Sequence, residues 1–142
     1  MWKGASHLII EKPLLGWGSN GYQHGMQALA GVGVIDPGVV QYEHAHNEFV
    51  DATAKRGVLG LAALLLLYLV PLRLFMRQLN APNLELRSLA VGGALLPVAY
   101  IDFGLSQAFL THNSGVMIYT FWLVVLWGSY RACQRKLENQ AI

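Results

Sequence analysis

The sequence predicts an all-α membrane protein in which about three transmembrane helices follow a segment of short helices and turns. Hydrophobic residues make up 54% of the 142 residues and charged residues only 13%, which is too apolar for an ordinary soluble domain. After residue 56 the chain consists of three long apolar runs separated by short polar connectors. We therefore expect residues 1–56 to form a polar segment and residues 57–142 to form the transmembrane region.

The segment before the apolar runs carries signals for turns and short helices. Trp2–Ile10 is a short amphipathic stretch, and EKPLLGWGSNGY and GVGVIDPGVV have the glycine and proline content of turns. Asn47 is a good N-cap residue, and Glu48 and Asp51 follow it where the helix dipole favours acids. The first long helix is therefore expected to begin at Asn47, ahead of its apolar part.

The three apolar runs are expected to span the membrane over about 57–75, 88–111 and 114–130. The uncharged run Gly57–Leu72 gives roughly 24 Å of helix, and flanking basic side chains that snorkel extend it to a bilayer core of about 30 Å. Asp102 is the only charge in the second run, and an acid inside a span is a functional candidate. The alternative is that this helix is shorter and Asp102 reaches the outer interface.

The basic residues predict the orientation, because cytoplasmic segments are enriched in Lys and Arg. Those in the first connector and after the third helix are Arg73, Arg77, Arg87, Arg131, Arg135 and Lys136. Residues 1–56 then lie outside and the C-terminus lies in the cytoplasm. The apolar patch Leu8–Ile10 is too short for a signal peptide, so we expect the chain to be the C-terminal piece of a longer membrane protein.

Charge and cysteine content exclude other classes of protein. The net charge is +2 and the ten Lys and Arg are scattered, so the basic stripe of a nucleic-acid-binding protein is absent and no nucleic-acid partner is expected. The single Cys133 excludes an internal disulfide and a multi-cysteine metal site. It is interpreted as a free thiol, with juxtamembrane palmitoylation as the alternative.

Ionisable residues are concentrated in HAHNEFVDATAKRGVLG, residues 44–60. His46 is placed just before the helix, where a histidine can exchange a proton near neutral pH, and Asp51 and Lys55 are expected to form a modest surface pair. A metal site of His44, His46 and Glu48 would need an extended strand; HExxH and a further well-spaced ligand are absent, so no metal is expected. Spacing alone favours capping or interfacial roles for both histidines over a catalytic one.

Two motifs in this part of the chain favour a catalytic role for His46 over a capping or interfacial one. His46-Asn47, nine residues, and then Gly57-Val58-Leu59-Gly60 resemble the H-N-x9-G-x-x-G signature of the O-antigen ligase and Wzy-type polymerase superfamily. Pro13-Leu-Leu-Gly16-Trp-Gly18 is similar to the P-x-x-G-x-G element that precedes this histidine in the family. His112-Asn113 is a second HN pair, but Leu123 stands where the glycine should be.

The resemblance implies a multi-pass enzyme of the bacterial inner membrane, with residues 1–56 in the periplasm. Its substrate would be an undecaprenyl-diphosphate-linked glycan, and the acceptor of an O-antigen ligase in lipopolysaccharide biosynthesis would be the lipid A core. A Wzy-type polymerase and a protein O-oligosaccharyltransferase are the alternatives. No cofactor, metal or nucleotide sugar is implied. A noncatalytic, truncated membrane protein that associates with a partner is the rival from another class.

Residue roles carry over from the resemblance at few positions. His46 matches the family's essential histidine, which would act as general base on the acceptor hydroxyl. The substrate-binding candidates are Asn47, Lys55 and Arg56; Asn47 would also cap and orient, and Lys55 and Arg56 would meet diphosphate or lipid headgroups. Ordinary interfacial snorkelling is the alternative for the two basic residues. The family's other diphosphate-binding arginines are expected upstream, so catalysis is expected of a longer parent.

Overall fold

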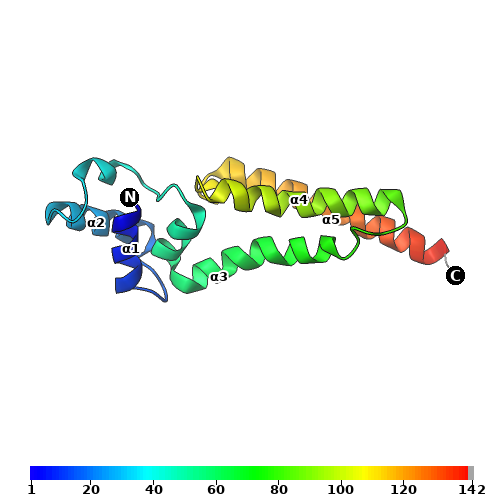
Figure 1. The fold of residues 1–142 in the computed structure, drawn as a ribbon, viewed down its shortest axis with the longest axis horizontal. Coiled ribbons are helices and arrows are strands. Elements are labelled where there is room, and N and C mark those ends of the chain that lie inside the picture. The colour runs from blue at the N-terminus through cyan, green and yellow to red at the C-terminus, as the bar shows by residue number, and fades with distance from the viewer. Residues whose placement is uncertain (141–142) are drawn as a thin grey trace. The chain divides into compact units, whose positions relative to one another are not determined.

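The computed structural model describes residues 1–140 and is all-helical over that range (Figure 1). The α-helices are α1 (Trp2–Glu11), α2 (Gly18–Gly31), α3 (Glu48–Met76), α4 (Leu84–Gly104) and α5 (Asn113–Gln140). Two short 3₁₀ helices are η1 (Pro37–Gln41) and η2 (Phe109–Thr111). The predicted all-α class is confirmed.

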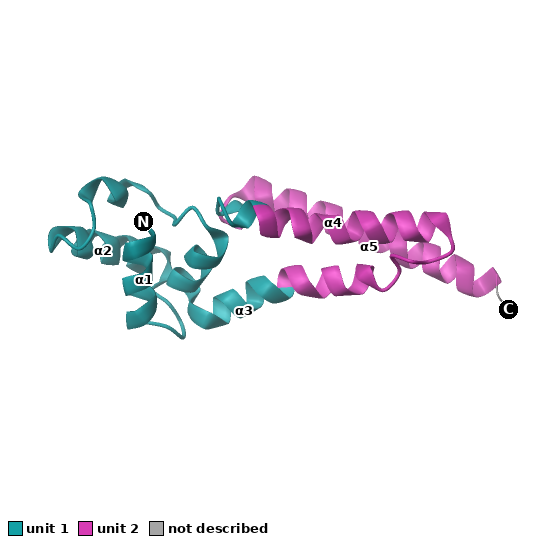
Figure 2. Cartoon of the chain, viewed as in Figure 1, with its two compact units in different colours: residues 1–66, 103–109 teal, residues 67–102, 110–142 magenta. Residues whose placement is uncertain are grey.

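The chain divides into two compact units (Figure 2). Residues 1–66 with 103–109 form the N-terminal unit, and residues 67–102 with 110–142 form the C-terminal unit. Helices α3, α4 and α5 are each long and apolar enough to cross a membrane. The chain is thus a membrane protein with three candidate spans.

Helix α3 begins where the sequence predicted. The side-chain oxygen of Asn47 accepts a hydrogen bond of 2.9 Å from the backbone N–H of Val50, which is the contact made by an N-cap residue. Glu48 and Asp51 occupy the first turn. The capping residues were sufficient to predict the start of α3, because the cap and its hydrogen-bond partner lie within one turn of each other.

Helix α4 is shifted relative to the expected range of 88–111. It begins at Leu84 because Asn83 caps it, accepting a 2.9 Å hydrogen bond from the N–H of Leu86. It ends at Gly104, where the N–H groups of Ser106 and Gln107 both bond to the carbonyl of Phe103 and close a turn. Asp102 is therefore an exposed residue in the last turn of a helix that ends earlier than expected, and its location at the outer interface stays a prediction.

Helix α5 continues to Gln140, beyond the expected end at residue 130. The uncharged run stops at Tyr130, but the following residues contain neither glycine nor proline and are mostly good helix formers. The end of an apolar run therefore did not mark the end of the helix.

The N-terminal unit has its own apolar core between α1, α2 and the start of α3. Met26 packs against Gly4, where an added Cβ would lie 2.6 Å from the Met26 sulfur. The buried members of this core are Ala5, Leu8, Tyr22, Met26, Ile35, Ala45 and Ala54. Ala45 belongs to the loop that precedes α3, so the core directly supports that loop.

The core of the C-terminal unit is centred on Phe75 of α3. Its ring lies against Gly93 of α4, at a distance that leaves no room for a side chain, and makes edge contacts with Trp127 and Tyr130 of α5. Cys133 is a free cysteine buried in the same core. Its burial supports the interpretation as a free thiol over a palmitoylation site.

Candidate functional site

Helix α3 is interrupted at Gly57, the first glycine of the H-N-x9-G-x-x-G motif. Gly57 has φ 67° and ψ −166°, a backbone conformation that is essentially restricted to glycine. In an unbroken helix the N–H of Val58 would bond to the carbonyl of Ala54. Here that N–H donates to the carbonyl of Pro13 at 2.8 Å, and the Ala54 carbonyl accepts from the N–H of Trp17 at 3.0 Å. The turn at residues 13–17 thus satisfies the groups that the kink releases.

The two glycine motifs cross at van der Waals contact. Gly16 has φ 68°, and a Cβ there would lie 2.5 Å from the carbonyl carbon of Lys55 and 2.6 Å from the nitrogen of Gly57. A Cβ on Gly57 would overlap the carbonyl oxygen of Leu14. These neighbours are backbone atoms, which cannot move aside as a flexible side chain can. The P-x-x-G-x-G element and the kink therefore form one interlocked structure, which we call the glycine crossing (residues 13–17 and 54–58).

His46 lies immediately before the N-cap, as predicted, and its backbone is unusual. Its φ of 50° is the only positive value at a non-glycine residue among those that the structure describes. Histidine is one of the residue types that adopt this conformation more often than most. A positive φ at such a position persists when the surrounding contacts determine it.

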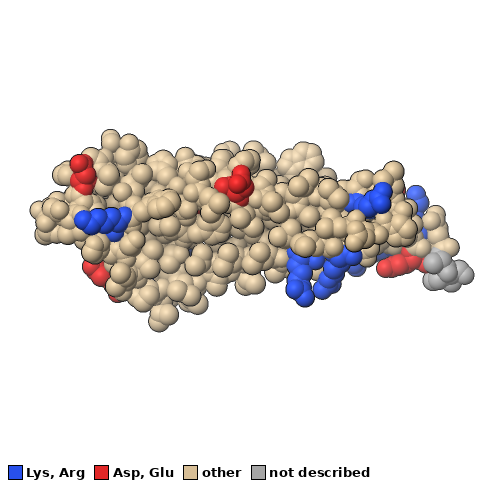
Figure 3. Space-filling model, in the orientation of Figure 1, with Lys and Arg blue, Asp and Glu red and all other residues tan. Residues whose placement is uncertain are grey.

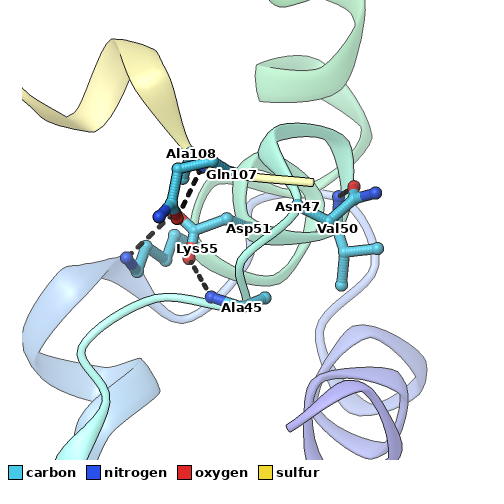
Figure 4. Close-up of polar contacts among 7 residues, drawn as sticks. All are labelled: Ala45, Asn47, Val50, Asp51, Lys55, Gln107 and Ala108. Carbon is cyan, nitrogen blue, oxygen red and sulfur yellow. Dashed lines mark hydrogen bonds and ion pairs between the residues drawn. The ribbon is translucent and has the colours of Figure 1, made fainter. Parts of the chain in front are cut away.

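Those contacts fix the residues on both sides of His46, and Figure 4 shows two of them, the bond between Ala45 and Asp51 and the bond between Val50 and Asn47. The N–H of Ala45 donates to Asp51 Oδ1 at 3.1 Å, and the carbonyl of Ala45 accepts from the indole N–H of Trp2 at 2.9 Å. The side-chain amide of Asn47 donates to the carbonyl of Leu105 at 3.0 Å, in addition to its capping bond. Since Ala45 and Asn47 are both buried, the backbone that carries His46 is held in one position.

The imidazole of His46 is half-buried among aromatic side chains. Its ring centroid lies 4.3 Å from that of His44 and 5.5 Å from that of Tyr42, both in edge-on arrangements. The segment is not a strand, and Glu48 is buried in the first turn of α3. Within residues 1–140, no three His, Cys, Asp or Glu side chains gather as metal ligands would. Tyr42 was not among the residues predicted from the sequence.

Asp51 and Lys55 form the predicted ion pair, but the pair is buried, so its expected location on the surface was wrong. Lys55 Nζ lies 2.9 Å from Asp51 Oδ2, and the two side chains are 9% and 1% exposed. The ammonium also lies 5.2 Å from the ring centroid of Tyr22. Burial, and secondarily the charge of Asp51, raise the pKa of Tyr22 to about 12. The spacing of Asp51 and Lys55 could not reveal that the pair is buried, because an i, i+4 pair has the same sequence pattern on a surface and in a core.

Asp51 connects the buried pair to the histidine loop. One of its carboxylate oxygens binds Lys55 and the other accepts from the N–H of Ala45 (Figure 4). Lys55 therefore neutralises the carboxylate that positions the residue before His46. This arrangement favours a structural role for Lys55, and direct contact with a substrate stays a prediction.

Arg56 differs from Lys55 in being exposed and without an ion pair within the described part of the chain. A Cβ on Gly60, the last glycine of the motif, would overlap the Cβ of Arg56, so Gly60 gives the Arg56 side chain its space. The helix rises by about 14 Å between Asn47 and Arg56. The structure thus places His46 and Arg56 at opposite ends of one short helical segment and does not bring their backbones together.

Comparison with known proteins identifies relatives of this chain. The family model described as O-antigen ligase matches residues 1–65, which include both glycine motifs and His46. An uncharacterized protein of Haemophilus influenzae is 34% identical over 119 residues, which are 84% of this chain and 30% of that protein. The chain spans about 30% of the length of this curated relative.

Proposed function

We propose that the chain, whose residues 1–65 match the family model described as O-antigen ligase, is part of a glycan transferase of the bacterial inner membrane. The donor is an undecaprenyl-diphosphate-linked glycan and the preferred acceptor is the lipid A core. The observation that carries this proposal is the fixed position of His46: the hydrogen bonds of Ala45 and Asn47 hold it just before α3, which is a candidate span.

The proposed reaction needs a base and stabilisation of a leaving diphosphate. His46 accepts the proton of an acceptor hydroxyl as that oxygen forms a bond to the anomeric carbon of the glycan. The bond from this carbon to the diphosphate oxygen breaks, and its electron pair leaves with undecaprenyl diphosphate. Arg56 is the better placed of the two basic candidates to stabilise the developing charge, because Lys55 is already paired. Asn47 positions His46 through two side-chain hydrogen bonds. It can contact the substrate only through the donor and acceptor capacity that these two bonds leave.

The proposed topology places residues 1–56 in the periplasm and the C-terminus in the cytoplasm. It is supported by the basic residues at the far ends of α3 and α5. The test uses single cysteines at positions 46 and 77 in a Cys133→Ala background. A membrane-impermeant maleimide should label position 46 in cells with a permeabilised outer membrane, and position 77 only after the inner membrane is also opened. The opposite pattern would contradict the proposed active site.

The proposed activity is tested by deleting the gene that encodes the chain and analysing the cell's glycans. Loss of a ligase should cause polymerised glycan to accumulate on undecaprenyl diphosphate, with none on the lipid A core. Loss of a polymerase should leave single repeat units on the core, and loss of a protein transferase should leave the core unaffected and a protein unmodified. Unchanged lipid-linked, core-linked and protein-linked glycans would refute a role in glycan transfer.

A further inference from the structure

A second polar site lies in the C-terminal unit, outside the residues that match the family model. It is an open pocket of about 210 Å³ between the end of α3 and the adjoining part of α5. The residues that line it are Leu74, Arg77, Gln78, Trp127, Tyr130, Arg131 and Gln134. Two of them are arginines and none is acidic, so the pocket carries a net positive charge.

The arginines of the pocket are available to a ligand. Arg77 and Arg131 are both exposed, and neither forms an ion pair within residues 1–140. The guanidinium of Arg131 lies 5.8 Å from the ring centroid of Trp127, and its Nη1 donates to Gln134 Oε1 at 3.2 Å. Only one of its five N–H donors is used in that bond. A planar fork of free donors fits the oxygens of a phosphate group.

Neighbouring contacts hold the wall of the pocket in place. The side-chain amide of Gln134 donates to the hydroxyl of Tyr130 at 3.3 Å, and that hydroxyl donates to the carbonyl of Leu74 at 3.5 Å. Trp127 and Tyr130 stack with ring centroids 5.6 Å apart. The pocket therefore has an ordered wall in which an aromatic pair adjoins the charged groups.

The pocket lies at the ends of two apolar runs, where a spanning helix would meet the lipid headgroups. Tyr130 ends the apolar run of α5, and Arg73 and Arg77 follow the apolar run of α3. Tryptophan, tyrosine and basic side chains are typical of the membrane interface. Lys and Arg side chains gather over this end of the C-terminal unit on the face shown in Figure 3. We propose that the pocket binds the phosphate of an anionic membrane lipid through Arg77 and Arg131, with the acyl chains along the apolar surfaces of α3 and α5.

The test measures binding of short-chain phosphatidylglycerol to the full chain in detergent by calorimetry. Phosphatidylcholine and inorganic phosphate are the comparison ligands. The pocket variant is Arg77→Gln with Arg131→Gln. The control is Arg73→Gln with Arg135→Gln, which removes the same charge from exposed positions that do not line the pocket. Circular dichroism of both variants checks that the helices form.

Saturable, one-to-one binding of phosphatidylglycerol should weaken by roughly tenfold for each arginine lost from the pocket, as expected for a charge-assisted hydrogen bond. The control should lose much less. If inorganic phosphate binds much more weakly than phosphatidylglycerol, the acyl chains contribute and the bound species is the lipid. If it binds as tightly, the site takes a free phosphate ion and the lipid assignment is overturned. Equal losses in the two variants, or no saturable binding, would also overturn it. If the pocket variant does not fold, Arg131→Lys keeps the charge but removes the planar fork, and should still weaken binding.

Discussion

Replacing Gly16 by alanine should separate the two halves of the glycine crossing. Gly16 and Gly18 have the same φ of 68°, but an added Cβ meets the α3 backbone at 2.5 Å at Gly16 and nothing within 4 Å at Gly18. An L-residue at positive φ costs about 1–2 kcal/mol, and this cost is common to both variants. Gly18→Ala is therefore a control for backbone conformation alone.

The additional cost at Gly16 follows from the hydrogen bonds of the crossing. To relieve the overlap, residues 13–17 must move away from α3 and lose the bonds from Val58 to Pro13 and from Trp17 to Ala54. Each such bond contributes about 0.5–1.5 kcal/mol net, so Gly16→Ala should cost about 2–5 kcal/mol in total. That is a large fraction of a typical stability of about 5–15 kcal/mol.

The measurement is the free energy of unfolding of the full chain and of the Gly16→Ala and Gly18→Ala variants, by SDS titration in mixed micelles with helicity as the signal. Gly16→Ala should lose at least about 1 kcal/mol more than Gly18→Ala, which corresponds to the two bonds. Equal losses in the two variants would show that the crossing contributes nothing beyond its local conformation. The two motifs would then be shown not to form one interlocked structure.

Three other substitutions test the contacts that shape the first part of α3 and the loop before it. Gly57→Ala should lower the free energy of unfolding by at least about 1–3 kcal/mol from backbone strain alone, and overlap with the Leu14 carbonyl adds to this loss. Limited proteolysis within residues 1–66 should therefore be faster, and an unchanged cleavage rate would contradict this prediction. Asp51→Asn leaves the buried ammonium of Lys55 without its charge partner, so it should lower the free energy of unfolding by about 3–5 kcal/mol, measured by thermal denaturation. The double variant Asp51→Asn with Lys55→Met removes the ammonium as well and should recover much of that stability. Asn47→Ala removes the N-cap and should cost about 1 kcal/mol in the same assay, and a neutral result would show that the cap contributes little.

The sequence predicted those features whose causes are local. The class of fold followed from the length and spacing of the apolar runs, and the start of α3 followed from Asn47 and the acids after it. The end of α4 at Gly104 and the extension of α5 were missed because hydropathy records where a helix meets lipid and not where its backbone hydrogen bonds stop.

The geometry of the candidate site depends on contacts between distant segments, and these were not predictable from spacing. The motif glycines at positions 16 and 57 indicated an unusual backbone conformation. Only the structure shows that a Cβ on either one would overlap the backbone of the segment that carries the other. Trp2, Tyr22 and Leu105 support the site from three separate parts of the chain, through an indole N–H, a ring face and a backbone carbonyl. None of these residues has a pattern of its own that would distinguish it from an ordinary core or loop residue.

The proposed function depends most directly on the proposed role of His46 as the base in glycan transfer. The measurement is the rate of transfer from undecaprenyl-diphosphate-linked glycan by the full-length protein carrying His46→Asn, a replacement that still tolerates positive φ. His112→Asn is the control, since it alters the HN pair that lacks the glycine motif. We predict a fall of about 10²–10⁴-fold for His46→Asn, with membrane insertion and thermal stability retained and the control near the normal rate. A near-normal rate for His46→Asn would contradict the proposed catalytic role.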